Sequence, residues 1–184
     1  MIRPLEENDI SSCLEIYNWY IENSVATFEE TKLSLSQFQQ RVHRICEKYP
    51  FLVLEENHKI IGYAYLDAFH ERSAYQWTVD LSIYLDHTMK TKGYGSMLME
   101  AILLAADKHG FYHVVSIVTE GNTASEKIHE KFGFEKEGFL KHVGYKHETW
   151  LGVSYYVNHL KQTSSQKLRC FLFVEFSTNK YIIE

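Results

Sequence analysis

The chain has 184 residues, of which 45% are hydrophobic and 15% aromatic, and its formal net charge is −5. This acidic balance excludes the basic footprint of a nucleic-acid-binding protein, no apolar run is long enough to span a membrane, and three scattered cysteines suggest neither a disulfide framework nor a zinc site. We therefore expect small-molecule chemistry in a reducing, cytoplasmic setting, with no nucleic-acid or membrane partner.

The spacing of apolar residues predicts a mixed α/β order of strands and helices. A strand at residues 2–5 comes first, and two amphipathic helices follow, one over residues 10–20 and one that begins near Ser34 or Ser36 and ends before Pro50. The remaining predicted elements are strands at 51–54, 59–69 and 77–85, a helix from about 97 to a cap at Gly110, a strand at 113–119, a helix at 123–132, and strands at 133–140 and 145–156.

The predicted elements form one α/β domain over residues 1–160. Residues 161–184 stand apart as a C-terminal extension. Their segment CFLFVEF is apolar and strand-prone, so it needs cover from its own sheet or a partner. We assign this extension no catalytic role.

The segment at 77–107 joins an alternating strand to a Gly-rich turn and an apolar helix. The odd-numbered residues of the strand are apolar, whereas the even-numbered face carries Thr78, Asp80, Ser82 and Tyr84. Because the turn at 90–96 precedes a helix, backbone N–H groups and the helix dipole converge there, as suits a phosphate. Taken alone, such a turn is also an ordinary connection with solvated lysines.

This turn resembles motif A of the GNAT superfamily of N-acetyltransferases, which holds the pyrophosphate of acetyl-CoA; Lys90 stands where Gln or Arg is usual. The segment at 122–134 resembles motif B, whose Asn and helix line the pantetheine arm, although an Asn there is also a common helix cap. The resemblance implies acetyl-CoA as cosubstrate and a mostly antiparallel, twisted central sheet with a splayed central strand pair, flanked by about four helices. The cofactor-binding residues that it implies are Lys90, Thr91, Lys92, Gly93, Tyr94, Gly95, Ser96, Asn122 and Ser125, with the backbone of Ile83, Tyr84 and Leu85.

Three further stretches, IYNWYIENSVATFEE, RSAYQWTVDLSIYL and GYKHETWLGV, resemble the branch that acetylates phosphinothricin and methionine sulfone. This resemblance implies direct acetyl transfer to the α-amino group of an amino acid or its analogue, by a homodimer. At Asp80 the branch normally carries a Glu that acts as general base. An Asp with its ordinary pKa of about 3.9 is a weak base, so burial would have to raise that pKa, or one water would relay the proton. The alternative for Asp80 is a structural hydrogen bond.

The same resemblance assigns further roles. Backbone N–H groups around residues 83–85 would polarise the thioester carbonyl, because a splayed strand leaves donors unpaired. His129, where many members have Tyr, is either a proton donor to the departing thiolate or a structural histidine. Arg72 would bind the acceptor α-carboxylate. The substrate-binding residues implied are Phe28, Arg72, Ser73 and Tyr75.

No His pair has metal-ligand spacing within one predicted helix, so we expect no metal. Two other functions remain open from the sequence. One is an acetyltransferase for a peptide N-terminus or for an amine that lacks a carboxylate. The other is a non-catalytic acyl-CoA-binding module.

Overall fold

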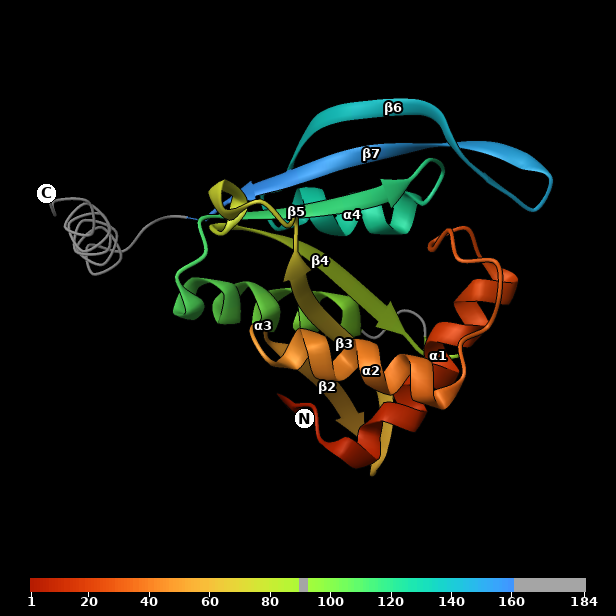
Figure 1. Ribbon diagram of the computed structural model, residues 1–184, viewed down its shortest axis with the longest axis vertical. Helices are drawn as coiled ribbons and strands as arrows, with labels where there is room; N and C mark the ends of the chain where they lie inside the picture. The colour runs from red at the N-terminus through yellow and green to blue at the C-terminus, as the bar shows by residue number, and fades with distance from the viewer. Residues whose placement is uncertain (90–92, 161–184) are drawn as a thin grey trace, which may run out of the picture.

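Figure 1 shows the computed structural model, which describes residues 1–89 and 93–160. The predicted turn residues Lys90, Thr91 and Lys92 and the extension at 161–184 lie outside the described residues. In the described ranges, no helix is long and apolar enough to cross a membrane. The elements in chain order are β1 (Ile2–Pro4), the 3₁₀ turn η1 (Glu7–Asp9), α1 (Ile10–Asn23), α2 (Leu35–Cys46), β2 (Phe51–Glu56), β3 (Lys59–Ala68), the 3₁₀ turn η2 (Ser73–Tyr75), β4 (Thr78–Leu85), α3 (Tyr94–His109), β5 (His113–Thr119), α4 (Thr123–Lys131), β6 (Glu135–Lys146) and β7 (Thr149–His159).

The strands form one seven-stranded sheet in the order β1-β2-β3-β4-β5-β7-β6. Every neighbouring pair is antiparallel except β4 and β5, which run parallel. Their ladder stops at the pair Asp80–Val115, although β4 continues to Leu85 and β5 to Thr119. The predicted mixed sheet with a splayed central strand pair is therefore confirmed.

Helices cover both faces of the sheet, and Figure 1 shows the β6–β7 hairpin along its far edge. On one face, α1 and α2 bury a cluster that includes Phe38 and Tyr84. On the other face, α3 buries Leu98 and Ile102. Alternate side chains of a strand point to opposite faces, so β4 serves both clusters. The alternation predicted for residues 77–85 is confirmed, since the residues that pack with α3 are Val79, Leu81, Ile83 and Leu85.

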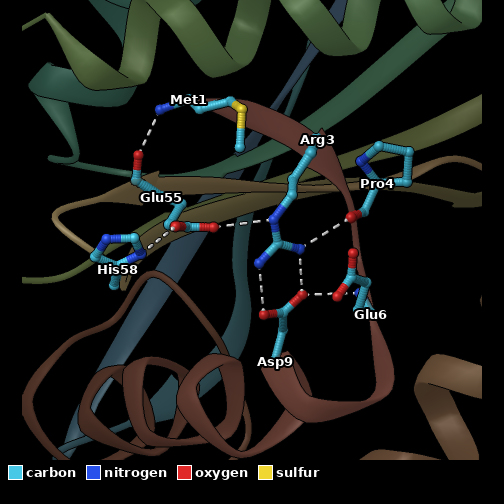
Figure 2. A network of polar contacts seen from close by, with 7 residues as sticks. All are labelled: Met1, Arg3, Pro4, Glu6, Asp9, Glu55 and His58. Atoms are coloured by element: carbon cyan, nitrogen blue, oxygen red, sulfur yellow. Dashed lines mark hydrogen bonds and ion pairs between the residues drawn. The ribbon is translucent and has the colours of Figure 1, made fainter.

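Arg3 ties the first strand to the start of α1 and to β2 (Figure 2). Its guanidinium donates to both carboxylate oxygens of the buried Asp9, at 2.6 and 2.9 Å, and to Glu55 Oε2 at 3.0 Å. Asp9 Oδ2 also accepts the N–H of Glu6 at 2.8 Å. Because Arg3 favours the ionised carboxylate, the pKa of Asp9 lies below its ordinary value. These bonds fix β1 at the edge of the sheet.

The last hairpin differs from the prediction of strands at 133–140 and 145–156. β6 continues to Lys146, and the turn lies at His147 and Glu148. Both turn residues have positive φ, 48° and 60°, without the Gly or Asn that normally signals such a turn. A register shift between Lys136 and Gly138 and another between Leu140 and Gly144 interrupt the pairing with β7, so most of the segment predicted as a loop, residues 141–143, forms a bulge within β6.

Candidate active site

A cavity of about 520 Å³ lies where β4 and β5 part. Residues 81–85 of β4 form one wall and residues 116–119 of β5 form the other, while residues 24–26 after α1 and the first turns of α4 close the sides. Asp80 is the last residue of β4 in the parallel ladder, so it lies beside the point where the strands separate. The splay therefore creates a cavity in the middle of the sheet.

Backbone N–H groups of β4 supply donors to this cavity. The carbonyl oxygen of Leu81 accepts a bond from Ser116 Oγ at 3.4 Å, and that of Leu85 accepts one from the Tyr20 hydroxyl at 3.0 Å. Odd-numbered residues thus turn their backbone groups away from β3. Since the N–H and C=O of one strand residue point to the same side, the N–H groups of Ile83 and Leu85 face the gap. Such donors suit an oxygen on which negative charge develops.

Asp80 lies on the face of the sheet covered by α1 and α2, and its Oδ1 is buried with no hydrogen-bond partner among the described residues. Burial disfavours the charged carboxylate, and the nearby Asp67 acts in the same direction, which together raise the pKa of Asp80 to about 7. A backbone hydrogen bond from Leu81 offsets part of this rise. A carboxyl group that exchanges its proton near neutral pH suits general-base catalysis. Asp80 does not line the cavity, but it directly precedes the first wall residue, Leu81.

His129 is buried in α4 and lines the cavity, with its ring centroid 4.8 Å from that of Phe134. Nδ1 lies 2.7 Å from the carbonyl oxygen of Ser125, so Nδ1 carries the proton and Nε2 the lone pair in the neutral ring. Nε2 is buried and has no partner within residues 1–89 and 93–160. Burial lowers the pKa of His129, so the neutral form dominates at pH 7.

The N-terminus of α3 contains the described part of the predicted pyrophosphate turn. Gly93 is the N-cap with a φ of 77°, a left-handed conformation that glycine adopts without strain. Gly95 lines the cavity, and a Cβ there would lie 3.1 Å from Ile128 Cδ1, so this glycine also lets α3 approach α4. The side chains of Tyr94 and Ser96 bond instead to a glutamate of β2 and a lysine of α4. Their backbone N–H groups are what they offer to an anion.

Asn122 and Ser125 line the cavity at the start of α4. Asn122 is also the N-cap, because its Oδ1 accepts the N–H of Ser125 at 3.3 Å. The two roles considered for Asn122, helix cap and cofactor ligand, are therefore compatible. The cap uses only Oδ1 and not the amide nitrogen.

The residues predicted to bind the acceptor lie apart from this cavity. Arg72, Ser73 and Tyr75 are exposed in or beside η2, just before β4, and none of them lines the cavity. Phe28 belongs to the loop between α1 and α2 and packs over Gly144, where a Cβ would come 2.0 Å from its ring. Of the nine predicted cofactor residues that the structure describes, six line the cavity, namely Ile83, Tyr84, Leu85, Gly95, Asn122 and Ser125, whereas Gly93, Tyr94 and Ser96 do not. None of the predicted acceptor residues lines it, and the roles of both groups stay predictions.

The sequence reasoning missed the walls contributed by α1 and β5. Ser116 and Thr119 are polar interruptions in the otherwise apolar strand HVVSIVT, and these interruptions were the available signal. Thr119 Oγ1 donates to the carbonyl oxygen of Val25 at 2.7 Å, which holds the loop after α1 against β5. Tyr20, through its bond to Leu85, joins α1 to the opposite wall.

The cavity has the features that an acetyl-CoA molecule needs. Backbone N–H groups of β4 face it, and the N-terminus of α3, capped by Gly93, offers N–H groups to an anion. Asn122 and Ser125 add polar side chains to the lining. In the part of the chain that the structure describes, no cluster of three or more His, Cys, Asp or Glu could hold a metal ion.

Comparisons with known proteins agree with this geometry. The family model of the acetyltransferase (GNAT) domain matches residues 2–153. A phosphinothricin N-acetyltransferase from Streptomyces viridochromogenes is 32% identical over 155 residues, which are 84% of this chain and 85% of that protein. An L-methionine sulfoximine/L-methionine sulfone acetyltransferase from Pseudomonas paraeruginosa is 30% identical over 166 residues, which are 89% of this chain and 96% of that protein. The crystal structure of a GNAT superfamily phosphinothricin acetyltransferase from Sinorhizobium meliloti in complex with AcCoA matches with a TM-score of 0.86 and 33% identity, over 90% of each chain.

Proposed function

Because the chain belongs to the GNAT family of acetyltransferases, we propose that it transfers the acetyl group of acetyl-CoA to the α-amino group of a small amino acid or amino-acid analogue. Relatives named for phosphinothricin and for methionine sulfoximine or sulfone support this acceptor class. The observation that carries the proposal is Asp80, a carboxyl group with a pKa of about 7 beside the point where β4 and β5 part.

Both substrates are bound at once in this mechanism, and no covalent enzyme intermediate forms. An α-ammonium group with its ordinary pKa of about 8 holds its proton at neutral pH, so it needs a base before its nitrogen can attack. Asp80 takes that proton, directly or through one water. The N–H groups of Ile83 and Leu85 bind the carbonyl oxygen of the acetyl group. His129, in its protonated form, donates a proton to the departing sulfur.

The pyrophosphate and the pantetheine arm of acetyl-CoA are assigned to residues in and beside the cavity. We assign the pyrophosphate to the turn at 90–96 and the pantetheine arm to Asn122 and Ser125. Support comes from Gly95, Asn122 and Ser125, which line the same cavity as the β4 donors. When bound there, acetyl-CoA supplies the activated acetyl group.

The acceptor assignments rest on the resemblance to the phosphinothricin branch. Arg72 would bind the α-carboxylate with two parallel hydrogen bonds. Ser73, Tyr75 and Phe28 would contact the rest of the acceptor. Arg72 therefore separates an amino-acid acceptor from an amine without a carboxylate.

We also propose that the enzyme is a cytoplasmic homodimer. The free thiols of Cys13 and Cys46 support a reducing compartment. Exposed apolar side chains on β6 and β7, among them Val143 and Trp150, support a subunit interface.

The proposal is tested by the release of free thiol from acetyl-CoA in the presence of single acceptors. The panel contains free amino acids, phosphinothricin, methionine sulfone, their decarboxylated amines and short peptides. We expect turnover only with acceptors that carry both an α-amine and an α-carboxylate. Asp80→Asn should lower kcat by about 10²–10⁴-fold, the range of general-base catalysis, and leave acetyl-CoA affinity unchanged. Arg72→Ala should raise KM for amino acids alone.

Other outcomes would redirect the assignment. Turnover of peptides or carboxylate-free amines only would identify the second acceptor class. A melting temperature raised by acetyl-CoA, with no transfer to any acceptor, would identify a non-catalytic binding module. Wild-type turnover by Asp80→Asn across the pH range would refute the base.

A further inference from the structure

Two carboxylates lie directly opposite each other on neighbouring strands. Asp67 of β3 pairs with Asp80 of β4 in the antiparallel register. Directly opposed residues project from the same face with Cβ atoms about 5 Å apart, and like charges there repel.

Asp67 is held by Arg44 of α2. The Arg44 guanidinium donates to Asp67 Oδ1 at 2.9 Å and to Oδ2 at 2.6 Å, and the N–H of Ala68 donates to Oδ1 at 2.8 Å. The side chain of Asp67 is 20% exposed, whereas that of Arg44 is 57% exposed. A helix residue at the surface thus fixes the orientation of the carboxylate that faces Asp80.

Apart from Asp67, the titratable groups near Asp80 are neutral or paired. Tyr65 and Tyr84 interact with Asp80, and burial raises the pKa of both hydroxyls, so both tyrosines are uncharged at neutral pH. Arg41 is paired with Glu29 at 2.6 Å, and β5 places the apolar Val115 opposite Asp80. Asp67 is the charged group whose field acts on Asp80. Asp67 and Tyr65 of β3 and Tyr84 of β4 interact with Asp80 directly. Tyr17 of α1, Arg41 and Arg44 of α2 and Glu29 of the loop between the helices interact in turn with these tyrosines or with Asp67.

We propose that the Arg44–Asp67 ion pair is a positioning device for the base: Asp67 adds to the effect of burial on the pH at which Asp80 gives up its proton, and Arg44 holds Asp67 in place and moderates its charge. The inference rests on the proposed role of Asp80 as general base. Neither Arg44 nor Asp67 lines the cavity, so both would act through Asp80.

Asp67 and Arg44 have opposite effects on the pKa of Asp80. The negative charge of Asp67 disfavours a second ionised carboxylate and so raises the pKa of Asp80. Arg44 opposes this effect through its ion pair with Asp67, because its positive charge reduces the negative potential that the pair presents to Asp80. A general base is most effective when its pKa lies near the working pH, so Asp67 makes Asp80 a stronger base than an isolated Asp.

The test is the pH profile of kcat/KM, measured between about pH 5 and pH 9 with an active amino-acid acceptor. Asp67→Asn removes a negative charge and lowers the pKa of Asp80, so the acid limb of the profile should move to lower pH by about one unit. The plateau value of kcat/KM should fall, because Asp80 becomes a weaker base. Arg44→Gln should move the limb to higher pH. Loss of an ion pair with only a structural role would not shift the limb in opposite directions for its two partners.

Matched variants serve as controls. Asp67→Glu restores a carboxylate and should return the wild-type limb. Glu22→Gln removes one exposed carboxylate, paired with Lys32 at the surface, and should leave the profile unchanged. Thermal melting confirms that each variant is folded.

A carboxyl-carbon NMR titration separates failure of this inference from failure of the proposed function. The Asp80 signal, assigned with Asp80→Asn, should titrate at lower pH in Asp67→Asn than in the wild type. An unchanged midpoint would overturn the inference and leave the proposed function standing. A shifted midpoint with an unchanged acid limb would remove Asp80 from the role of base, and with it this inference.

Discussion

His129 places one ring nitrogen against the Ser125 carbonyl, and the other, Nε2, is buried without a hydrogen-bond partner in the described part of the chain. A buried nitrogen without a partner is uncommon in folded proteins and calls for a role in binding or catalysis. Because burial lowers its pKa, His129 donates a proton only from the small protonated fraction at neutral pH. At neutral pH, only a small fraction of His129 is therefore protonated and able to donate to the proposed leaving group.

We expect His129→Gln to lower kcat by about tenfold or less, because a thiol with a pKa near 8.5 leaves as a thiolate that solvent can also protonate. Steady-state kinetics, with acetyl-CoA affinity from calorimetry, measures the effect. His43→Gln, at an exposed histidine of α2, is the control and should leave kcat unchanged. An unchanged kcat with a lowered melting temperature in His129→Gln would leave only a structural role.

At the level of elements, the loop between α1 and α2 is positioned by β6. The buried Lys146 of β6 donates from Nζ to the carbonyl oxygen of Thr27 at 2.7 Å, and burial lowers its pKa. Gly144 on the same strand leaves room for the ring of Phe28. Since residues 24–26 of this loop line the cavity, β6 determines one side of the candidate site.

Lys146→Met keeps the length of the side chain but leaves the Thr27 carbonyl oxygen without its donor. We expect KM for the acceptor to rise by about 5–30-fold, the equivalent of about 1–2 kcal/mol for one lost hydrogen bond, because Thr27 adjoins the proposed acceptor residue Phe28. The KM for acetyl-CoA should rise less, through residues 24–26, which line its cavity. Two-substrate steady-state kinetics separates the two constants. Lys141→Met, at an exposed lysine of the same strand, is the matched control. Equal changes in both KM values would mean a general disturbance of the fold.

Features that depend on neighbouring residues in the chain, such as the two faces of β4, could be predicted from the sequence. Contacts between residues that lie far apart in the chain could not. Alternation along β4 predicted its two faces, which are confirmed, and the family resemblance singled out Asp80 on the polar face. The last hairpin turn was misplaced because His147 and Glu148 adopt positive φ without a glycine. The bond between Lys146 and Thr27 joins residues that lie far apart in the chain, and the pairing of Asp67 with Asp80 depends on strand register. Neither contact leaves a short-range signal.

For the molecule as a whole, the β6–β7 hairpin exposes several large apolar side chains. Its large exposed side chains include Leu140, Val143 and Trp150, the last with 59% of its surface exposed. Exposed apolar patches of this kind are typical of protein interfaces. The proposed homodimer would bury them.

We expect light scattering to give twice the chain mass of 21.7 kDa for the wild type and the single-chain mass for Val143→Glu, because a buried charge without a partner disfavours the interface. Lys141→Gln, beside the apolar residues, should keep the wild-type mass. A wild-type protein that stays monomeric at micromolar concentration would refute the pairing.

The connectivity of the sheet also orders its assembly during synthesis. β2, β3 and β4 follow one another in the chain and in the sheet, so they can pair through short connections as they leave the ribosome. β5 joins β4 only after α3 has been made, and its other neighbour, β7, is the last described strand. The β5 wall of the cavity is therefore completed late in synthesis. Lys146 of β6, which holds the loop between α1 and α2, is also made late.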